Sequence, residues 1–115
     1  MRSDRLYLTD IVEAADAIAT FLAGVDRSGF ISNDLVRSAV LQKLIIIGEA
    51  AAHLSGEFRE KRPEIEWRDI ANFRNIAVHA YFSIDWLIVW FAATKDAPEL
   101  RETVSRILAQ DFPED

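Results

Sequence analysis

Apolar residues recur at spacings of three and four along most of this 115-residue chain, and this helical period constrains its fold more than any other feature. The clearest example lies near the N-terminus, where the apolar positions are Leu8, Ile11, Val12, Ala15, Ile18, Ala19 and Leu22. Nowhere does the pattern alternate with the period of two that is typical of a half-buried strand. The four Gly and three Pro residues are too few for an all-β domain with many tight turns. The sequence therefore predicts an all-α protein.

Breaks in the apolar pattern divide the chain into separate helices. Gly24 ends the first helix, and the stretch from there to Ser32 is predicted to be a loop, with Ser32 or Asn33 as the N-cap of the next helix. Ser83 is the expected N-cap of a later helix that starts near Ile84. The predicted helices cover residues 4–23, 33–54, 57–62, 66–80, 84–95 and 97–109.

The last two helices are expected to be separated by a break or bend near Lys95. The sequence Asp96-Ala97-Pro98-Glu99 is typical of a new helix N-terminus with Asp96 as its cap. The simplest arrangement of all these elements is an antiparallel four-helix bundle with one or two short additional helices. We expect it to form one domain over residues 1–115, because a chain of this length holds one hydrophobic core.

The composition excludes several classes of protein. The chain has no Cys, which excludes disulfide scaffolds, zinc sites with Cys ligands and thiol catalysis. Its net charge of −6 is opposite in sign to that of proteins that coat nucleic acid non-specifically. The longest apolar run, residues 86–93, is far shorter than the roughly 20 residues that span a bilayer, and the N-terminus lacks the apolar core of a secretory signal. We therefore expect a cytoplasmic protein with no membrane contact.

The predicted helix after Ser83 is apolar on almost all sides. Between Asp85 and Thr94 it carries the sequence W-L-I-V-W-F-A-A, which leaves no polar stripe for solvent. A helix of this kind must be covered all round. Either a second copy of the chain covers it or the final helix folds back over it, and the sequence leaves both arrangements open.

The predicted helix over 66–80 carries the most unusual polar residues. At about 100° per residue, one stripe consists of Arg68, Asn72, Asn75 and His79. Arg74 and Tyr81 share a second line at the border of the apolar face. A solvated helix face normally favours Glu and Lys, whereas these side chains form specific hydrogen bonds. The stripe is therefore either an ordinary exposed face with a His near the helix end, or part of a phosphodiester site.

The second interpretation has a defined chemistry. His can carry a proton at neutral pH, and Arg can hold a phosphate through a bidentate fork. Together they suffice for RNA cleavage without a metal. Arg74 and His79 are five residues apart, however, and so lie about 140° apart on a regular helix. They can converge only if the helix distorts or ends there, or if two copies of the chain meet.

The segment R-N-I-A-V-H-A-Y, residues 74–81, resembles the R-x4-H-x-Y motif of HEPN-domain toxins of the HepT type, whose partner is the MntA antitoxin. Other segments resemble the same family in the same order along the chain. They are L-T-D-I-V-E-A, L-I-I-I-G-E-A-A-A-H-L-S, F-R-E-K-R-P-E-I-E-W-R-D-I, Y-F-S-I-D-W-L-I-V-W and A-P-E-L. The R-x4-H spacing alone is weak, but this order of segments makes the resemblance strong.

The resemblance implies a homodimeric HEPN four-helix bundle with the motif at the dimer interface. It also implies a metal-independent ribonuclease that needs no cofactor and acts as the toxin of a toxin–antitoxin pair. Arg74 and His79 would be catalytic, and Asn75 would support them or contact RNA. Tyr81 would accept AMP from an MntA-like nucleotidyltransferase antitoxin, placing a bulky anion beside Arg74. Glu49 matches a further family position and would orient Arg74.

Other readings of the sequence stay open beside this one. The chain could be a non-catalytic helical bundle that binds a nucleotidyltransferase or a nucleotide, or a plain helical dimer used in assembly. Glu49 and His53, four residues apart, could hold a metal, although an ordinary helix pair is the simpler interpretation. Trp86 and Trp90 could stack on bases, but their apolar neighbours favour packing. Residues 57–74 carry five basic and five acidic residues, so the segment that contains Arg74 is less acidic than the rest.

Overall fold

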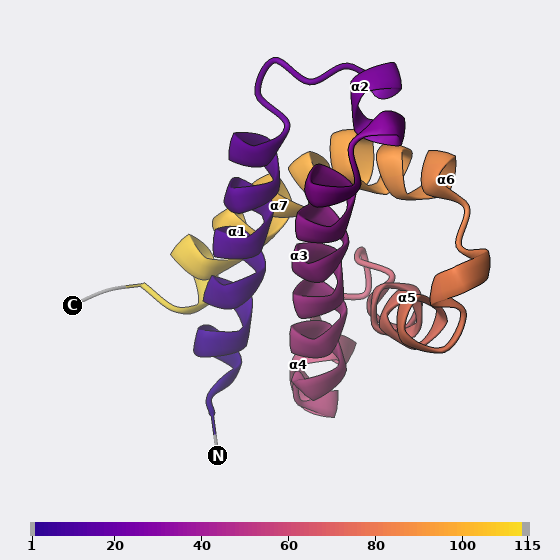
Figure 1. The fold of residues 1–115 in the computed structure, drawn as a ribbon. Helices are drawn as coiled ribbons and strands as arrows, with labels where there is room; N and C mark the ends of the chain where they lie inside the picture. Colours follow the sequence, from indigo (N-terminus) through magenta and orange to yellow (C-terminus); the bar gives the residue numbers. More distant parts are fainter. Residues whose placement is uncertain (1, 114–115) are drawn as a thin grey trace.

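A computed structural model describes residues 2–113, and all regular elements among these residues are helical (Figure 1). The α-helices are α1 (Asp4–Phe21), α2 (Arg27–Ser32), α3 (Asp34–His53), α4 (Gly56–Lys61), α5 (Trp67–His79), α6 (Trp86–Phe91) and α7 (Ala97–Asp111). A 3-10 turn, η1 (Tyr81–Ser83), precedes α6, and a π-helical turn, η2 (Ala92–Asp96), joins α6 to α7. The prediction of an all-α helical bundle is confirmed.

Short polar side chains set the starts of the first helices. The Ser3 hydroxyl accepts a hydrogen bond from the Leu6 amide at the start of α1. The Asn33 side chain accepts one from the amide of Val36 at 3.1 Å, so Asn33 is the N-cap of α3. Ser55 caps α4 in the same way. Each cap satisfies an amide that has no partner inside its helix, which fixes where the helix begins.

The prediction of a loop over residues 24–32 is wrong in part, because this stretch contains α2. The Asp26 carboxylate caps α2 by accepting a hydrogen bond from the Gly29 amide at 2.7 Å. Phe30 anchors the helix, since its side chain is fully buried and its ring packs 5.3 Å from that of Trp90. The sequence pattern missed α2 because six residues are too few to show a helical period.

The predicted caps of the last two helices are also wrong. Ser83 lies in η1, and the α6 cap is Asp85, whose side chain accepts a hydrogen bond from the Leu87 amide. Asp96 caps nothing, because α6, η2 and α7 form one continuous bent helix. The bend has a physical cause: Pro98 has no N–H to give to the preceding turn, and the wider π-helical turn takes up the disruption.

The core lies where α1, α3 and α7 meet. Figure 1 shows α1 and α3 side by side, with α7 crossing beside them and α5 on the other side of α3. The largest side chains that are fully buried are Phe30, Leu8, Ile11, Ile18, Ile107, Val40, Val89 and Val104. The helix α5 packs mainly on one long helix, α3. The remainder of its surface is therefore available to carry a site.

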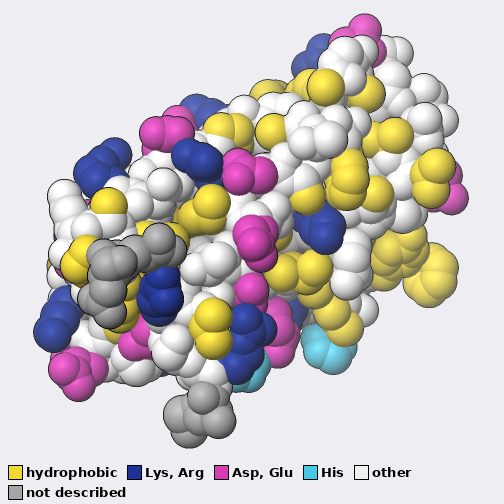
Figure 2. All heavy atoms as spheres, turned by 90° about the vertical axis from the view of Figure 1, so that its left-hand side faces the viewer, with side chains coloured by type: hydrophobic (Ala, Val, Ile, Leu, Met, Phe, Trp, Pro, Cys, Tyr) yellow, Lys and Arg dark blue, Asp and Glu magenta, His cyan; other side chains and the backbone are white. Residues whose placement is uncertain are grey.

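Ion pairs join the elements around this core. Arg62, after α4, donates to Asp111 at the end of α7 through two nitrogens, at 3.0 and 2.7 Å. Arg101 of α7 contacts Asp16 of α1 at 3.0 Å. On the face in Figure 2, basic and acidic side chains intermingle and apolar ones gather towards one end, so this face has no broad basic area. No helix within residues 2–113 is both long enough and apolar enough to cross a bilayer.

Candidate functional site

Arg74 lies in the middle of α5, at a point where α5 packs tightly against α3. A Cβ atom added to Gly48 of α3 would lie 2.9 Å from the Cβ atom of Arg74 and 3.0 Å from the carbonyl oxygen of Ile70. Such distances are shorter than van der Waals contact allows, so only glycine permits this approach of the two helices. Gly48 was not among the residues singled out from the sequence. The signal was present, because a glycine inside a helical pattern often marks a close packing contact.

The Arg74 guanidinium is held between α3 and its own helix. Its Nη1 atom donates to Oε2 of Glu49 at 2.6 Å. Its Nε and Nη2 atoms donate to Oδ1 of Asn75 at 3.1 and 2.9 Å. The side chain of Arg74 is 27% exposed and that of Glu49 is 50% exposed, so the pair lies at the surface. The structure thus brings together three of the residues singled out from the sequence.

This arrangement leaves Arg74 with unused hydrogen-bonding capacity. A guanidinium has five N–H donors, and the contacts to Glu49 and Asn75 use one on each nitrogen. One N–H therefore remains on each of Nη1 and Nη2. Two donors on neighbouring nitrogens can hold two oxygens of a phosphate group. Arg74 is chemically suited to bind an anion without giving up its fixed position.

His79 is the last residue of α5 and is exposed. Its side chain has no hydrogen bond or ion pair with any residue from 2 to 113, so both ring nitrogens can meet a ligand or water. Because α5 is regular from Trp67 to His79, Arg74 and His79 keep their large angular separation and do not meet within one chain.

Tyr81 follows two residues after His79 and lies in η1. Its side chain is 41% exposed. Its ring packs edge-on against Phe82 at 5.4 Å and against Trp86 at 6.4 Å. The contacts support one side of the ring, while the exposed fraction keeps part of the side chain in contact with solvent. No described residue hydrogen-bonds to its hydroxyl group.

The polar stripe of α5 is exposed along its whole length. Its four members, Arg68, Asn72, Asn75 and His79, all lie on the solvent side of the helix. The opposite side carries Trp67 and Ala77, the two buried residues of α5. The stripe therefore forms a surface that starts at the N-terminus of α5 and ends at His79.

Glu49 also contacts His53, the other residue of the possible metal pair. Nδ1 of His53 lies 2.8 Å from the carbonyl oxygen of Glu49 and 3.6 Å from its Oε1 atom. The His53 ring stacks on that of Tyr7, with centroids 5.4 Å apart. These are the contacts of an ordinary helix pair, and no group of three potential ligands that could hold a metal occurs within residues 2–113.

Large apolar side chains are exposed along the chain from the end of α5 through η1 to α6. This α5–α6 surface consists of Ile76, Val78, Tyr81, Phe82, Leu87, Ile88 and Phe91. Phe82 is fully exposed and Ile88 is 60% exposed. Of the two arrangements that the sequence left open, the final helix does not fold back over this region, since Leu87, Ile88 and Phe91 stay exposed and α7 continues onward from η2 (Figure 1). Trp86 and Trp90 pack against Phe30 of α2, as their apolar neighbours favoured.

The sequence matches the family described as Ribonuclease HepT-like over residues 11–107. The protein named "Putative RNase MJ1380" from Methanocaldococcus jannaschii is 37% identical over 103 residues, which cover 90% of this chain and 94% of that protein. "Putative RNase TTE0752" from Caldanaerobacter subterraneus subsp. tengcongensis is 32% identical over 111 residues, covering 96% and 99% of the two chains.

A third relative, named "Probable ribonuclease HepT", comes from Thermococcus cleftensis. It is 36% identical over 100 residues, which cover 87% of this chain and 91% of that protein. No solved structure matches the chain. The family match and the relatives extend over nearly the whole sequence, including the segment from Arg74 to Tyr81. The chain therefore belongs to the family of HepT-like ribonucleases.

Proposed function

We propose that this protein is a metal-independent endoribonuclease and the toxin of a toxin–antitoxin pair. The observation that carries the proposal is the guanidinium of Arg74, which Glu49 and Asn75 hold in place while two of its N–H donors stay free. His79, five residues further along α5, has no hydrogen bond with any residue from 2 to 113. Membership in the HepT-like family and the names of the relatives support RNA as the substrate. Arg74 and His79 are the proposed catalytic residues, Glu49 and Asn75 position Arg74, and the protein acts in the cytoplasm.

The proposed reaction is attack of an RNA 2′-hydroxyl on the neighbouring phosphorus. His79 accepts the hydroxyl proton as the new O–P bond forms, and it returns a proton to the 5′ oxygen as the P–O5′ bond breaks. The products are a 2′,3′-cyclic phosphate and a 5′-hydroxyl end. Charge builds on the phosphate oxygens in the transition state, where the two free N–H groups of Arg74 stabilise it.

The catalytic pair is proposed to form between two copies of the chain. Within one chain Arg74 and His79 face different directions, so a partner copy is needed to bring a His beside an Arg. The α5–α6 surface supports this arrangement, because it is apolar, exposed and continuous along the chain with His79. Single exposed apolar residues are common, but a run of seven on neighbouring elements favours an interface.

Tyr81 is the proposed control point of the toxin. A cognate MntA-like nucleotidyltransferase would catalyse attack of the Tyr81 hydroxyl on the α-phosphorus of ATP, giving tyrosyl-AMP and releasing pyrophosphate. Tyr81 is 41% exposed in the single chain, so such a partner could reach it on a chain that is not paired with a second copy. An AMP group two residues from His79 adds negative charge where the RNA phosphate would bind, and so prevents cleavage.

The test of this proposal is cleavage of RNA by the purified protein and by its Arg74→Ala and His79→Ala variants. We expect the parent to cut RNA in the presence of a chelator, to leave cyclic phosphate ends and to inhibit growth, while both variants do neither. Equal growth inhibition by parent and variants would refute the assignment. A parent that leaves RNA uncut but binds the nucleotidyltransferase would instead favour the non-catalytic bundle.

A further inference from the structure

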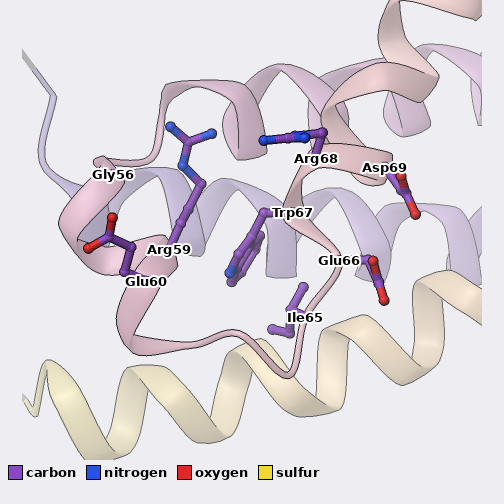
Figure 3. A pocket seen from close by; sticks show the side chains of 8 residues that line it. All are labelled: Gly56, Arg59, Glu60, Ile65, Glu66, Trp67, Arg68 and Asp69. Atoms are coloured by element: carbon purple, nitrogen blue, oxygen red, sulfur yellow. The ribbon is translucent and has the colours of Figure 1, made fainter.

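Arg59 of α4 and Arg68 of α5 line the same surface hollow, of about 620 Å³, next to the buried Trp67. Figure 3 shows the two guanidinium groups extending towards one another across this hollow. Neither side chain makes an ion pair or hydrogen bond with any residue between 2 and 113. Two unpaired cations that share a hollow repel each other, and a bound anion would relieve that repulsion.

Three acidic residues share the hollow with the two arginines. Glu60, Glu66 and Asp69 also line it, but none of them forms an ion pair with either arginine. In Figure 3, the carboxylates of Glu66 and Asp69 point away from the two guanidinium groups at the opposite edge. The arrangement differs from that at Arg74, where a carboxylate lies directly against the guanidinium.

The hollow is continuous with the polar stripe of α5. Arg68 is both a lining residue and the first member of the stripe, whose last member is His79. Eleven residues of α-helix separate the two, which is a distance of about 16 Å. At about 3.4 Å per nucleotide of a stacked strand, this corresponds to about five nucleotides. A single RNA strand can therefore lie along α5 and reach both ends of the stripe.

We propose that Arg59 and Arg68 form a second phosphate-binding site, which holds the RNA strand about five nucleotides from the bond that is cut. The inference rests on the proposed function, because it takes RNA as the substrate and His79 as the reacting group. The exposed amides of Asn72 and Asn75 lie along the path between the two sites. The site gives the enzyme a preference for RNA long enough to span α5 over shorter fragments.

The test compares a dinucleotide with a single-stranded RNA of about twenty nucleotides, using an Arg59→Ala/Arg68→Ala double variant. We expect KM for the long RNA to rise about tenfold more than KM for the dinucleotide. For the long RNA, the slope of log KM against the logarithm of the salt concentration should decrease by about 1.4, which is about 0.7 for each lost phosphate contact. The control is Arg27→Ala, which removes an exposed, unpaired arginine at the start of α2.

Two further measurements separate the possible outcomes. Glu60→Gln removes a negative charge from the hollow and should lower KM for the long RNA. The proposal would be overturned if the double variant raised KM equally for both substrates, or if its KM values matched those of Arg27→Ala. If the parent cuts neither substrate, the proposed function fails, and binding of the long RNA by fluorescence anisotropy then tests the site alone. Weaker binding by the double variant but not by Arg27→Ala would support the site, and unchanged binding would refute it.

Discussion

Glu49 and Arg74 lie 25 positions apart in the sequence and are joined by an ion pair of 2.6 Å between α3 and α5. The residue before Glu49 is Gly48, whose missing side chain lets α5 approach α3 at that point. The direction of the Arg74 guanidinium therefore depends on the packing of two helices as well as on its own rotamer. The position of Arg74, the proposed catalytic residue, and the packing of α5 on α3 are thus coupled through these two neighbouring positions of α3.

The ion pair leads to a first prediction about Glu49 as a positioning residue. In Glu49→Ala the Arg74 guanidinium loses its contact to α3, so we expect kcat for RNA cleavage to fall about tenfold. KM should fall as well, because a negative charge beside the phosphate site is removed. Steady-state kinetics on a defined RNA would measure this split.

Glu49→Gln is the matched control for that prediction. Gln keeps an oxygen that can accept the hydrogen bond from Nη1 of Arg74 but carries no charge. We expect kcat to stay within about threefold of the parent and KM to fall as in the Ala variant. Because the Glu49–Arg74 pair is exposed, the free energy of unfolding of both variants should lie within about 1 kcal/mol of that of the parent. An unchanged kcat in Glu49→Ala would show that Arg74 needs no support from α3.

The second prediction concerns Gly48. A methyl group there would lie 2.9 Å from the Cβ atom of Arg74, so Gly48→Ala must push α5 away from α3. We expect the free energy of unfolding to fall by about 1–3 kcal/mol and RNA cleavage to fall with it. Gly56→Ala is the control, since a Cβ atom at Gly56 meets nothing within 4 Å. Urea denaturation of both variants would test this, and equal stabilities would contradict the close contact.

The sequence was sufficient to predict the long helices because each carries a clear apolar period, and α1 and α3 also have polar caps. Leu8, Ile11 and Ile18, for example, were predicted on one face of a helix and are all buried in α1. The sequence was insufficient where the structure depends on contacts between distant residues. Phe30 of α2, for example, packs on Trp90, sixty positions away, and no local pattern encodes that contact.

The candidate site shows the same division. The spacing of Arg74 and His79 was visible in the sequence, the family resemblance pointed to Glu49 as a partner of Arg74, and the structure places Glu49 against Arg74. The double contact from Asn75 to Arg74 was not predicted, because a neighbouring residue on a helix normally points in another direction. The bend at η2 was placed near the right residue but attributed to a cap, since a π-helical turn has no distinct sequence pattern.

The third prediction concerns the pH dependence of stability. Hydrogen bonds from Arg62 hold the pKa of Asp111 below its ordinary value. The unfolded chain therefore binds a proton at this carboxyl at higher pH than the folded chain does. The Arg62–Asp111 pair therefore contributes fully to the free energy of unfolding above about pH 5. This contribution is lost as the pH falls through the lowered pKa of Asp111 in the folded state.

Asp111→Asn should therefore reduce stability at pH 7 but have little effect near pH 2, so that the two stability curves converge in acid. Glu13→Gln is the control, because Glu13 is exposed on α1 and has no ion pair with a described residue. Urea denaturation at a series of pH values would measure both curves. A constant difference between Asp111→Asn and the parent down to pH 2 would refute the linkage.

The fourth prediction tests the proposed dimer. Ile88→Glu places a charge on the α5–α6 surface, where burying it against a second copy would be costly. We expect this variant to be monomeric by analytical ultracentrifugation and to lose RNA cleavage, whereas the parent is dimeric and active. Leu6→Glu is the control, since Leu6 is 46% exposed at the start of α1, which lies far from α5 and α6 (Figure 1). A dimeric Ile88→Glu would show that another surface joins the copies.

The last prediction uses the two tyrosines of the chain, Tyr7 and Tyr81. Tyr7 is half-buried and stacks on His53, whereas Tyr81 is 41% exposed in η1. After coexpression with a cognate MntA-like nucleotidyltransferase, we expect mass spectrometry to find AMP on Tyr81 and none on Tyr7. Tyr81→Phe should stay unmodified and keep cutting RNA in the presence of the partner. Tyr7→Phe should be modified and silenced like the parent, because its change leaves the acceptor hydroxyl in place. An active partner that leaves Tyr81 unmodified, or that silences Tyr81→Phe equally well, would mean that the toxin is controlled by binding alone.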